Sequence, residues 1–181
     1  MSDNSEQRQK PHNWHAFDPK LKKGMWGHYI AQTAIATACV AVLLLLLLKL
    51  GHLVIVAALG SSAFVVFAMP HKIRSNPRYI VGGHVLCLLT GSLIRLIMHG
   101  WVFQAIKIDP DIESILACSL AVGASLFVMV ATDTEHPPAA GTAVGSSIAP
   151  FSYEMAFSVV LGATLLSLGK FALRRWLKDL V

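Results

Sequence analysis

The chain has 181 residues, of which 55% are hydrophobic and only 14% are charged, and its formal net charge is +5. A soluble domain of this size could not bury so many segments that are apolar on every face, so the composition excludes an ordinary soluble protein. The positive charge lies in loops and tails, where it reports on topology and gives little support for nucleic-acid binding. The expected class is an all-α polytopic membrane protein with the lipid bilayer as its main partner.

Residues 1–24 are polar and basic, with no small-residue cleavage site, which indicates a cytoplasmic N-terminal tail rather than a signal peptide. Five apolar runs follow, most of them long enough to cross roughly 30 Å of hydrocarbon as a helix. Cysteines occur only inside these runs, so a disulfide framework is not expected. The runs are Tyr29–Leu48, Leu53–Met69, Ile80–Met98, Ser114–Thr132 and Met155–Leu168.

The basic residues decide the number of passages, because positive charge tends to stay on the cytoplasmic side. Basic clusters lie in the N-terminal tail, at Lys72–Arg78 and around the C-terminal tail of residues 174–181, whereas the loop at 107–113 is mainly acidic. Five crossings would leave the C-terminal tail outside. Six crossings satisfy every cluster, with residues 137–153 as a short sixth passage. We therefore expect a membrane domain at 25–173 with both termini cytoplasmic, in a membrane of the bacterial inner type.

Two stretches of the chain share an order of polar and small residues. Each has a histidine (His52 or His136), then Gly-Ser-Ser after eight or nine residues, then a proline. Each lies in the middle of a three-passage unit, at residues 29–98 and 114–173, and three passages turn the second unit upside down. Short or broken helices at matching positions of inverted repeats point to a transporter site. Chance similarity between small-residue membrane segments is the alternative.

Residues 133–147 read DTEHPPAAGTAVGSS. Pro137 and Pro138 suit the first turn of a helix, with His136 at or just before its cap. Gly141 and Gly145 form a GxxxG pair that lets another helix approach closely. A polar stretch at membrane depth is tolerated only inside protein or along a watery cavity. We expect a broken helix that presents N–H and O–H groups to a small polar solute. A packing helix whose hydroxyls bond to their own carbonyls is the alternative.

Two blocks, TEHPPAAGTA and LGSSAFVVFAMPHKIRSNPRYIVGGH, resemble the characteristic blocks of the HPP family of integral membrane proteins, and the resemblance covers roughly residues 25–173. The family is usually described with four membrane helices, which differs from the six passages expected from charge. Plant plastid and cyanobacterial members are associated with nitrite transport, and many bacterial members have no assigned substrate. The resemblance implies a transporter, with nitrite as the leading candidate.

The residues expected to line a pathway combine small, hydroxyl, imidazole and cationic side chains. His136, with Asp133 and Glu135, is also a candidate for proton coupling, since imidazole titrates near neutral pH; a structural cap is the alternative. His84 could instead be an interfacial histidine, and Arg95 could extend its side chain to the interface. The pathway candidates are Gly60, Ser61, Ser62, His84, Arg95, His136, Pro137, Pro138, Thr142, Gly145, Ser146 and Ser147.

These features predict a transporter or channel for a small inorganic anion, nitrite first, and not an enzyme. No catalytic residue, cofactor or metal is expected, since two carboxylates and one histidine within four residues are a weak metal signal. The alternatives are a cation or proton pathway through Asp133, Glu135 and His136, a membrane-embedded enzyme, and a sensor or scaffold subunit. A homo-oligomer is left open.

Overall fold

The computed structural model describes residues 24–47, 53–100 and 105–180. Within these residues the chain forms six α-helices and two 3-10 turns and contains no β-strand, so the fold is all-α as predicted. The expected N-terminal tail, apart from Gly24, and His52 lie outside the described residues. The elements in chain order are α1 (Trp26–Leu47), α2 (Leu53–Ala68), η3 (Ile73–Ser75), α3 (Pro77–Met98), α5 (Pro110–Ala131), η4 (Pro137–Ala139), α6 (Ala140–Ile148) and α7 (Tyr153–Leu173).

Four of the helices, α1, α3, α5 and α7, begin before the apolar runs that predicted them. In α3, α5 and α7 the reason is that polar residues and prolines build or cap the first turns. Pro77 opens α3 and Pro110 opens α5, where a missing N–H leaves no bond unmade. The Asp109 carboxylate accepts two backbone N–H groups of α5 at 3.0 and 3.3 Å. The Ser152 hydroxyl accepts one from α7 at 3.1 Å. These caps satisfy amides that a helix start would otherwise leave unpaired.

Four helices, α1, α3, α5 and α7, are long and apolar enough to cross a membrane. The other two are shorter: α2 has 16 residues and α6 has 9. The four long helices agree with the number usually given for the resembled family. The six helices nevertheless alternate in direction, and η4 with α6 follows α3 from Gly83 to Arg95. That stretch of α3 measures roughly 18 Å at 1.5 Å per residue.

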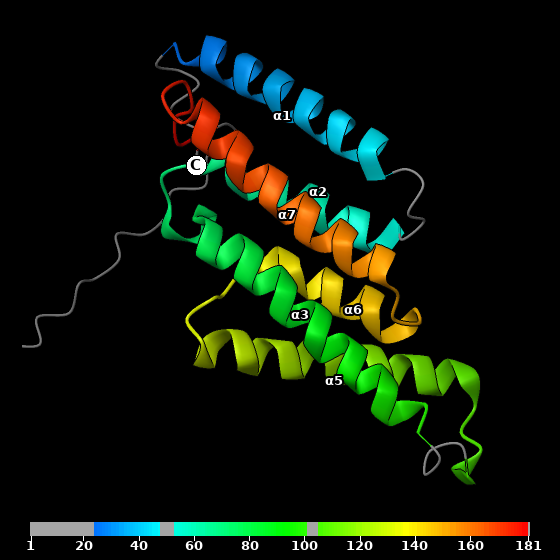
Figure 1. The fold of residues 1–181 in the computed structure, drawn as a ribbon. Coiled ribbons are helices and arrows are strands. Elements are labelled where there is room, and N and C mark those ends of the chain that lie inside the picture. Colours follow the sequence, from blue (N-terminus) through cyan, green and yellow to red (C-terminus); the bar gives the residue numbers. More distant parts are fainter. Residues whose placement is uncertain (1–23, 48–52, 101–104, 181) are drawn as a thin grey trace, which may run out of the picture.

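The packing order of the helices repeats between the two halves of the chain. α1 and α5 lie on opposite outer sides of the bundle, with the other four helices between them (Figure 1). α1 packs on α2 and α7, while α5 packs on α6 and α3. The halves meet through the pairs α2–α6, α3–α7, α2–α7 and α3–α6. Exchanging α1 with α5, α2 with α6 and α3 with α7 reproduces the same set of main helix contacts.

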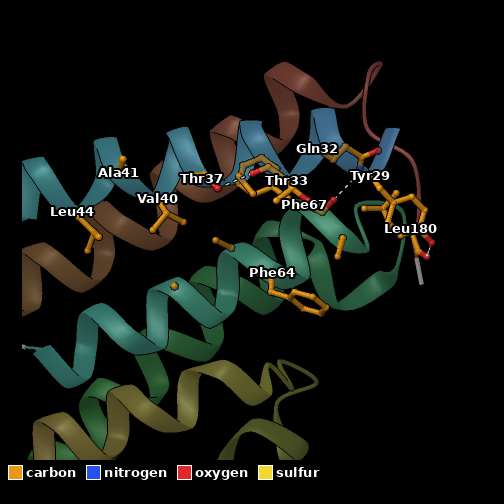
Figure 2. A pocket seen from close by; sticks show the side chains of 14 residues that line it. Tyr29, Gln32, Thr33, Thr37, Val40, Ala41, Leu44, Phe64, Phe67 and Leu180 are labelled. Carbon is orange, nitrogen blue, oxygen red and sulfur yellow. Dashed lines mark hydrogen bonds between the residues drawn. The ribbon is translucent and has the colours of Figure 1, made fainter. Parts of the chain in front are cut away.

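The two ends of the described chain meet beside α1 and α2. Gln32 of α1 is 2% exposed, and its Nε2 donates to the Phe67 carbonyl at 2.8 Å and to the Lys178 carbonyl at 2.9 Å. The Lys178 N–H donates back to Gln32 Oε1 at 2.9 Å. Tyr29 Oη donates to the Leu180 carbonyl at 2.8 Å, and these contacts border a cavity of about 600 Å³ between α1 and α2 (Figure 2). The chain therefore enters and leaves the bundle at the same end.

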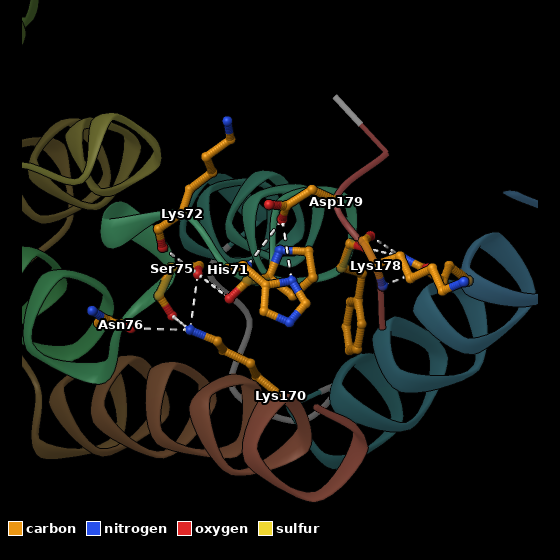
Figure 3. Close-up of polar contacts among 10 residues, drawn as sticks. His71, Lys72, Ser75, Asn76, Lys170, Lys178 and Asp179 are labelled. Atoms are coloured by element: carbon orange, nitrogen blue, oxygen red, sulfur yellow. Dashed lines mark hydrogen bonds and ion pairs between the residues drawn. The ribbon is translucent and has the colours of Figure 1, made fainter. Parts of the chain in front are cut away.

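Two basic segments that the sequence predicted on one side do lie at one end of the bundle, called here the basic end. Lys170 Nζ donates to the carbonyl and hydroxyl oxygens of Ser75, each at 2.9 Å, and to Asn76 Oδ1 at 3.2 Å. The Asp179 carboxylate accepts the His71 backbone N–H at 3.0 Å (Figure 3). Residues 174–180, which belong to the predicted basic C-terminal tail at 174–181, are thus fastened to the loop between α2 and α3.

Candidate functional site

A buried chain of four polar side chains connects α2, α3 and residues 133–147, called here the HPP segment. Ser62, His84, His136 and Thr142 are each 0% exposed. Ser62 Oγ lies 2.8 Å from Nε2 of His84 and 2.9 Å from Nε2 of His136. His84 Nδ1 lies 2.7 Å from Thr142 Oγ1. The structure therefore brings together four of the predicted pathway residues, from distant parts of the sequence, in one continuous network.

Glycine next to His84 lets the HPP segment lie directly on α3. A Cβ at Gly83 would be 2.8 Å from the Cβ of His136 and 3.1 Å from the Thr134 carbonyl oxygen. A Cβ at Gly82 would be 3.2 Å from Thr134 Cγ2. The sequence Gly-Gly-His thus removes two side chains from the face of α3 that receives His136. His136 itself is the N-cap residue of η4, as the sequence predicted.

The turn before His136 is fixed by contacts with the start of α3. Asp133 has a φ of 52°, in the left-handed region that few non-glycine residues adopt. Its carboxylate accepts a hydrogen bond from Tyr79 Oη at 3.0 Å and lies 3.3 Å from Nη2 of Arg78. Arg78 also donates to the Thr132 carbonyl at 3.1 Å. The predicted proton-coupling residue Asp133 is therefore held by structural contacts.

The hydroxyl of Ser62 has one proton but three hydrogen-bonding neighbours, which constrains the imidazoles. Besides the two Nε2 atoms it lies 3.1 Å from the Ala58 carbonyl, which can only accept. Ser62 can donate to one neighbour at a time, so at least one Nε2 must carry a proton and donate to Ser62. Every side chain in this network can act both as donor and as acceptor.

The ring of His136 has one nitrogen that the network does not use. Its Nδ1 is buried and makes no hydrogen bond of normal geometry with the described residues, although the backbone of Arg74 lies close enough to favour a proton on the ring. Burial lowers the pKa of His136, which lies outside the four long helices, to about 4 despite an opposing interaction with the Arg74 backbone. An unpaired polar atom in such a place calls for a partner, such as water or a bound solute.

His136 also lines a cavity of about 690 Å³ at the basic end. Much of its wall is apolar, but a small set of polar and cationic residues faces it. The exposed Ser61, Lys72 and Arg74 line it together with Pro137 and Pro138. Arg74 Nη1 donates to the Glu135 carbonyl at 3.4 Å, which ties the loop between α2 and α3 to the HPP segment. The cavity and the buried network thus meet at one imidazole.

The residues of the two Gly-Ser-Ser triplets lie in different surroundings. Successive helical residues point about 100° apart. Ser61 therefore lines the cavity at the basic end and Ser62 joins the network, while Gly60 lines the cavity between α1 and α2. Ser146 donates to the Thr142 carbonyl at 2.8 Å and Ser147 to the Val144 carbonyl at 2.8 Å.

The second triplet and Arg95 are engaged in helix packing. A Cβ at Gly145 would be 3.0 Å from Cγ1 of Ile55, so this glycine is where α2 and α6 touch. Arg95 Nη1 donates to the Ile148 carbonyl at 2.6 Å, which places a cation at the C-terminal end of α6. The sequence predicted a pathway role or an interfacial role for Arg95, and this capping contact is a third role that it did not predict.

Some residues of the site could not be singled out from the sequence. Thr134 is 8% exposed and fills the space beside Gly82, and Tyr79 holds Asp133, yet neither stands out in its segment. The Gly-Gly pair before His84 was a usable signal for close approach. Among the described residues, no group of three or more His, Cys, Asp and Glu side chains is arranged to hold a metal ion.

Residues 18–177 match the family described as HPP, transmembrane region, so the chain belongs to the HPP family of membrane proteins. Two proteins of Dictyostelium discoideum, each named only as a transmembrane protein, are similar over half of this chain. One is 31% identical over 91 residues and the other 28% over 90. These matches cover only 29% and 26% of the relatives' own lengths. No solved structure matches the chain.

Proposed function

We propose that this HPP protein is a transporter or channel for a small inorganic anion, with nitrite as the first candidate. The observation that carries the proposal is the cavity of about 690 Å³ at the basic end, where Lys72, Arg74, Ser61 and His136 face one space. Cationic side chains attract an anion to such a mouth. The hydroxyl and the imidazole can donate hydrogen bonds to it without the trapping that a full ion pair deep in the protein would cause.

The carboxylates near the cavity do not favour a cation. No Asp or Glu is among the residues that line it. Asp133 faces Arg78 and Tyr79 instead, and Glu135 meets Arg74 through its backbone carbonyl. If positive residues mark the inner side, the basic end is cytoplasmic, and the cavity is the inner mouth of the pathway.

The packing order of the helices supports a transporter built from two inverted units. The main helix contacts stay the same when α1, α2 and α3 are exchanged with α5, α6 and α7, as such a repeat would produce. The exchange pairs α2 with α6, the two short helices, and these carry the network residues Ser62 and Thr142. Short helices at the junction of inverted repeats are where many transporters bind their solute. Six passages follow if both short helices cross with their flanking turns.

Flux into proteoliposomes tests the proposal. Nitrite, nitrate, chloride and formate are compared in vesicles containing the wild type, Arg74→Gln or Ser61→Ala, with leakage of nitrous acid measured in empty vesicles. Arg175→Gln is the control, because Arg175 is an exposed cation at the same end but does not line this cavity. Arg74→Gln should lower anion flux about tenfold or more, and the control should leave it unchanged. Flux of sodium or potassium in place of any anion would refute the proposal.

A further inference from the structure

We propose that His136, Ser62, His84 and Thr142 form a proton relay that moves a proton together with the transported anion. The inference rests on the proposed function, because it names the ion to which anion movement is coupled. Its basis is geometric: three consecutive contacts of 2.7–2.9 Å join hydroxyls and imidazoles that are all fully buried. The outer end is the unpaired Nδ1 of His136, and His136 lines the cavity.

The relay can be written so that every proton is accounted for. At the start, His136 carries its proton on Nε2, Ser62 donates to His84 Nε2, and His84 Nδ1–H donates to Thr142. A proton from the cavity binds to Nδ1 of His136. His136 Nε2–H then passes its proton to Ser62 Oγ as the Ser62 proton moves to Nε2 of His84. His136 and Ser62 end neutral, and the added charge rests on His84, with its Nδ1–H still donating to Thr142 Oγ1. The same transfers in reverse return the proton to Nδ1 of His136, from which it is released when the anion leaves.

The charged groups around His136 favour transfer of the proton from His136 to His84 over a positive charge that stays on His136. Lys72 and Arg74 face the same cavity, and His84 lies behind, with ring centroids 5.5 Å apart. From the HPP segment itself, Asp133 is paired with Arg78, while Glu135 is half-buried and meets Arg74 through its carbonyl. The described parts of α2 and α6 contain no charged residue. No Asp or Glu is among the residues that line the cavity, so no carboxylate there holds a positive charge on His136.

An anion in the cavity makes protonation of the two imidazoles more favourable and thereby couples the movement of the anion to that of the proton. A negative charge beside His136 favours the extra proton on the pair of imidazoles, and the protonated pair favours the anion by the same free energy. Anion and proton therefore bind together. Ser62 is a positioning and relay residue in this scheme, because without its hydroxyl the two Nε2 atoms have no common partner.

Measurement of both ions in the same vesicles tests the relay. Full-length protein is reconstituted with a pH-sensitive dye inside, the membrane potential is clamped with potassium and valinomycin, and nitrite is added outside. Nitrite entry and internal acidification are followed together, with empty vesicles subtracted. Wild-type protein should carry about one proton with each anion. Ser62→Ala should lower the number of protons taken up per nitrite about tenfold.

Ser167→Ala is the matched control, because Ser167 is also a buried serine, and its hydroxyl donates only to the Ala163 carbonyl of its own helix at 2.9 Å. It should leave both fluxes unchanged. Nitrite entry without protons in the wild type, or proton uptake per nitrite in Ser62→Ala equal to that of the wild type, would overturn the relay while the anion proposal stands. Absence of anion flux in the folded wild type would overturn both.

Nitrogen-15 NMR of labelled histidine gives a readout that needs no transport. The signals of His84 and His136 are assigned from His84→Gln and His136→Gln proteins in lipid nanodiscs. In the wild type, the ring nitrogens of His136 should report exchange between its two tautomers and those of His84 exchange between its Nδ1–H form and the cation, and in Ser62→Ala each ring should settle into one form. Fixed tautomers in the wild type would show that the network is only structural and would overturn the relay.

Discussion

The contact between α3 and α6 gives the sharpest test of the packing described above. Gly91 is buried in the middle of α3, and a Cβ placed on it would overlap the Ala143 carbonyl oxygen and the Ser146 hydroxyl. The same carbon would be 3.0 Å from Ala143 Cα, nearer than the 3.5–4.0 Å at which two carbons attract best. Two of the three nearest atoms belong to the backbone, so a rotamer change cannot relieve the clash.

Gly91→Ala should therefore force α3 and α6 apart. Overpacking of this kind costs about 1–3 kcal/mol, whereas replacing glycine by alanine within a helix returns up to about 1 kcal/mol. We expect a net loss of about 1–2 kcal/mol in the free energy of unfolding. The proposed anion flux should fall as well, because α6 carries Thr142 and follows directly from His136.

Two other glycines calibrate the measurement. A Cβ at Gly162 in α7 would meet only side-chain atoms of Leu59, which can rotate, so Gly162→Ala should cost less than Gly91→Ala. Gly123 in α5 has no atom within 4 Å of its Cβ position, so Gly123→Ala should be neutral or stabilising. Unfolding in mixed micelles, followed by circular dichroism, gives the order. If Gly91→Ala were as stable as Gly123→Ala, the close packing of α3 on α6 would be wrong.

Three further predictions concern the ends of the bundle and pH. Arg95→Met should destabilise the protein by about 1.5–3 kcal/mol in the same assay, because the Ile148 carbonyl loses a charged donor; Arg95→Lys should recover part of this, and no loss with methionine would contradict the capping role. Gln32→Leu should release the segment at Lys178, seen as faster proteolysis near the C-terminus with α1 still protected; unchanged cleavage would count against the contact. Because the pKa of His136 falls from 6.5 to about 4 on folding, the folded state binds fewer protons between these values. Its contribution to stability is complete above pH 6.5 and is lost as pH falls toward 4, so His136→Gln should flatten the stability profile in that window, and an unchanged slope would refute the assignment.

The sequence predicted the helices well because apolar length is a strong signal, and it missed their starts for a definable reason. The first turns of α3, α5 and α7 consist of prolines, acids and a serine cap, which hydropathy treats as loop. Charge patterning placed the two basic segments at one end, which the contacts of Lys170 confirm. The count of six passages and the inverted repeat remain predictions that the alternating helix directions fit.

The candidate site was only partly predictable, because its members come together through tertiary packing. The HPP triplet and Gly-Gly-His each marked a histidine, but no pattern in the chain shows that His84 and His136 share Ser62. Hydroxyl residues at helical spacing look alike in sequence whether they face a partner or their own helix. That ambiguity explains why Ser62 joined the network while Ser147 bonds to its own helix.

The bond between Gln32 and Lys178 has a consequence for biogenesis. α1 is synthesised first, yet its polar partner is among the last described residues to leave the ribosome. Until then Gln32 can donate to the Phe67 carbonyl, but both of its bonds to Lys178 are missing. Locking of α1 therefore waits until the segment around Lys178 has been made, and a chain stalled before Lys178 would leave Gln32 Oε1 without the backbone N–H that it accepts here.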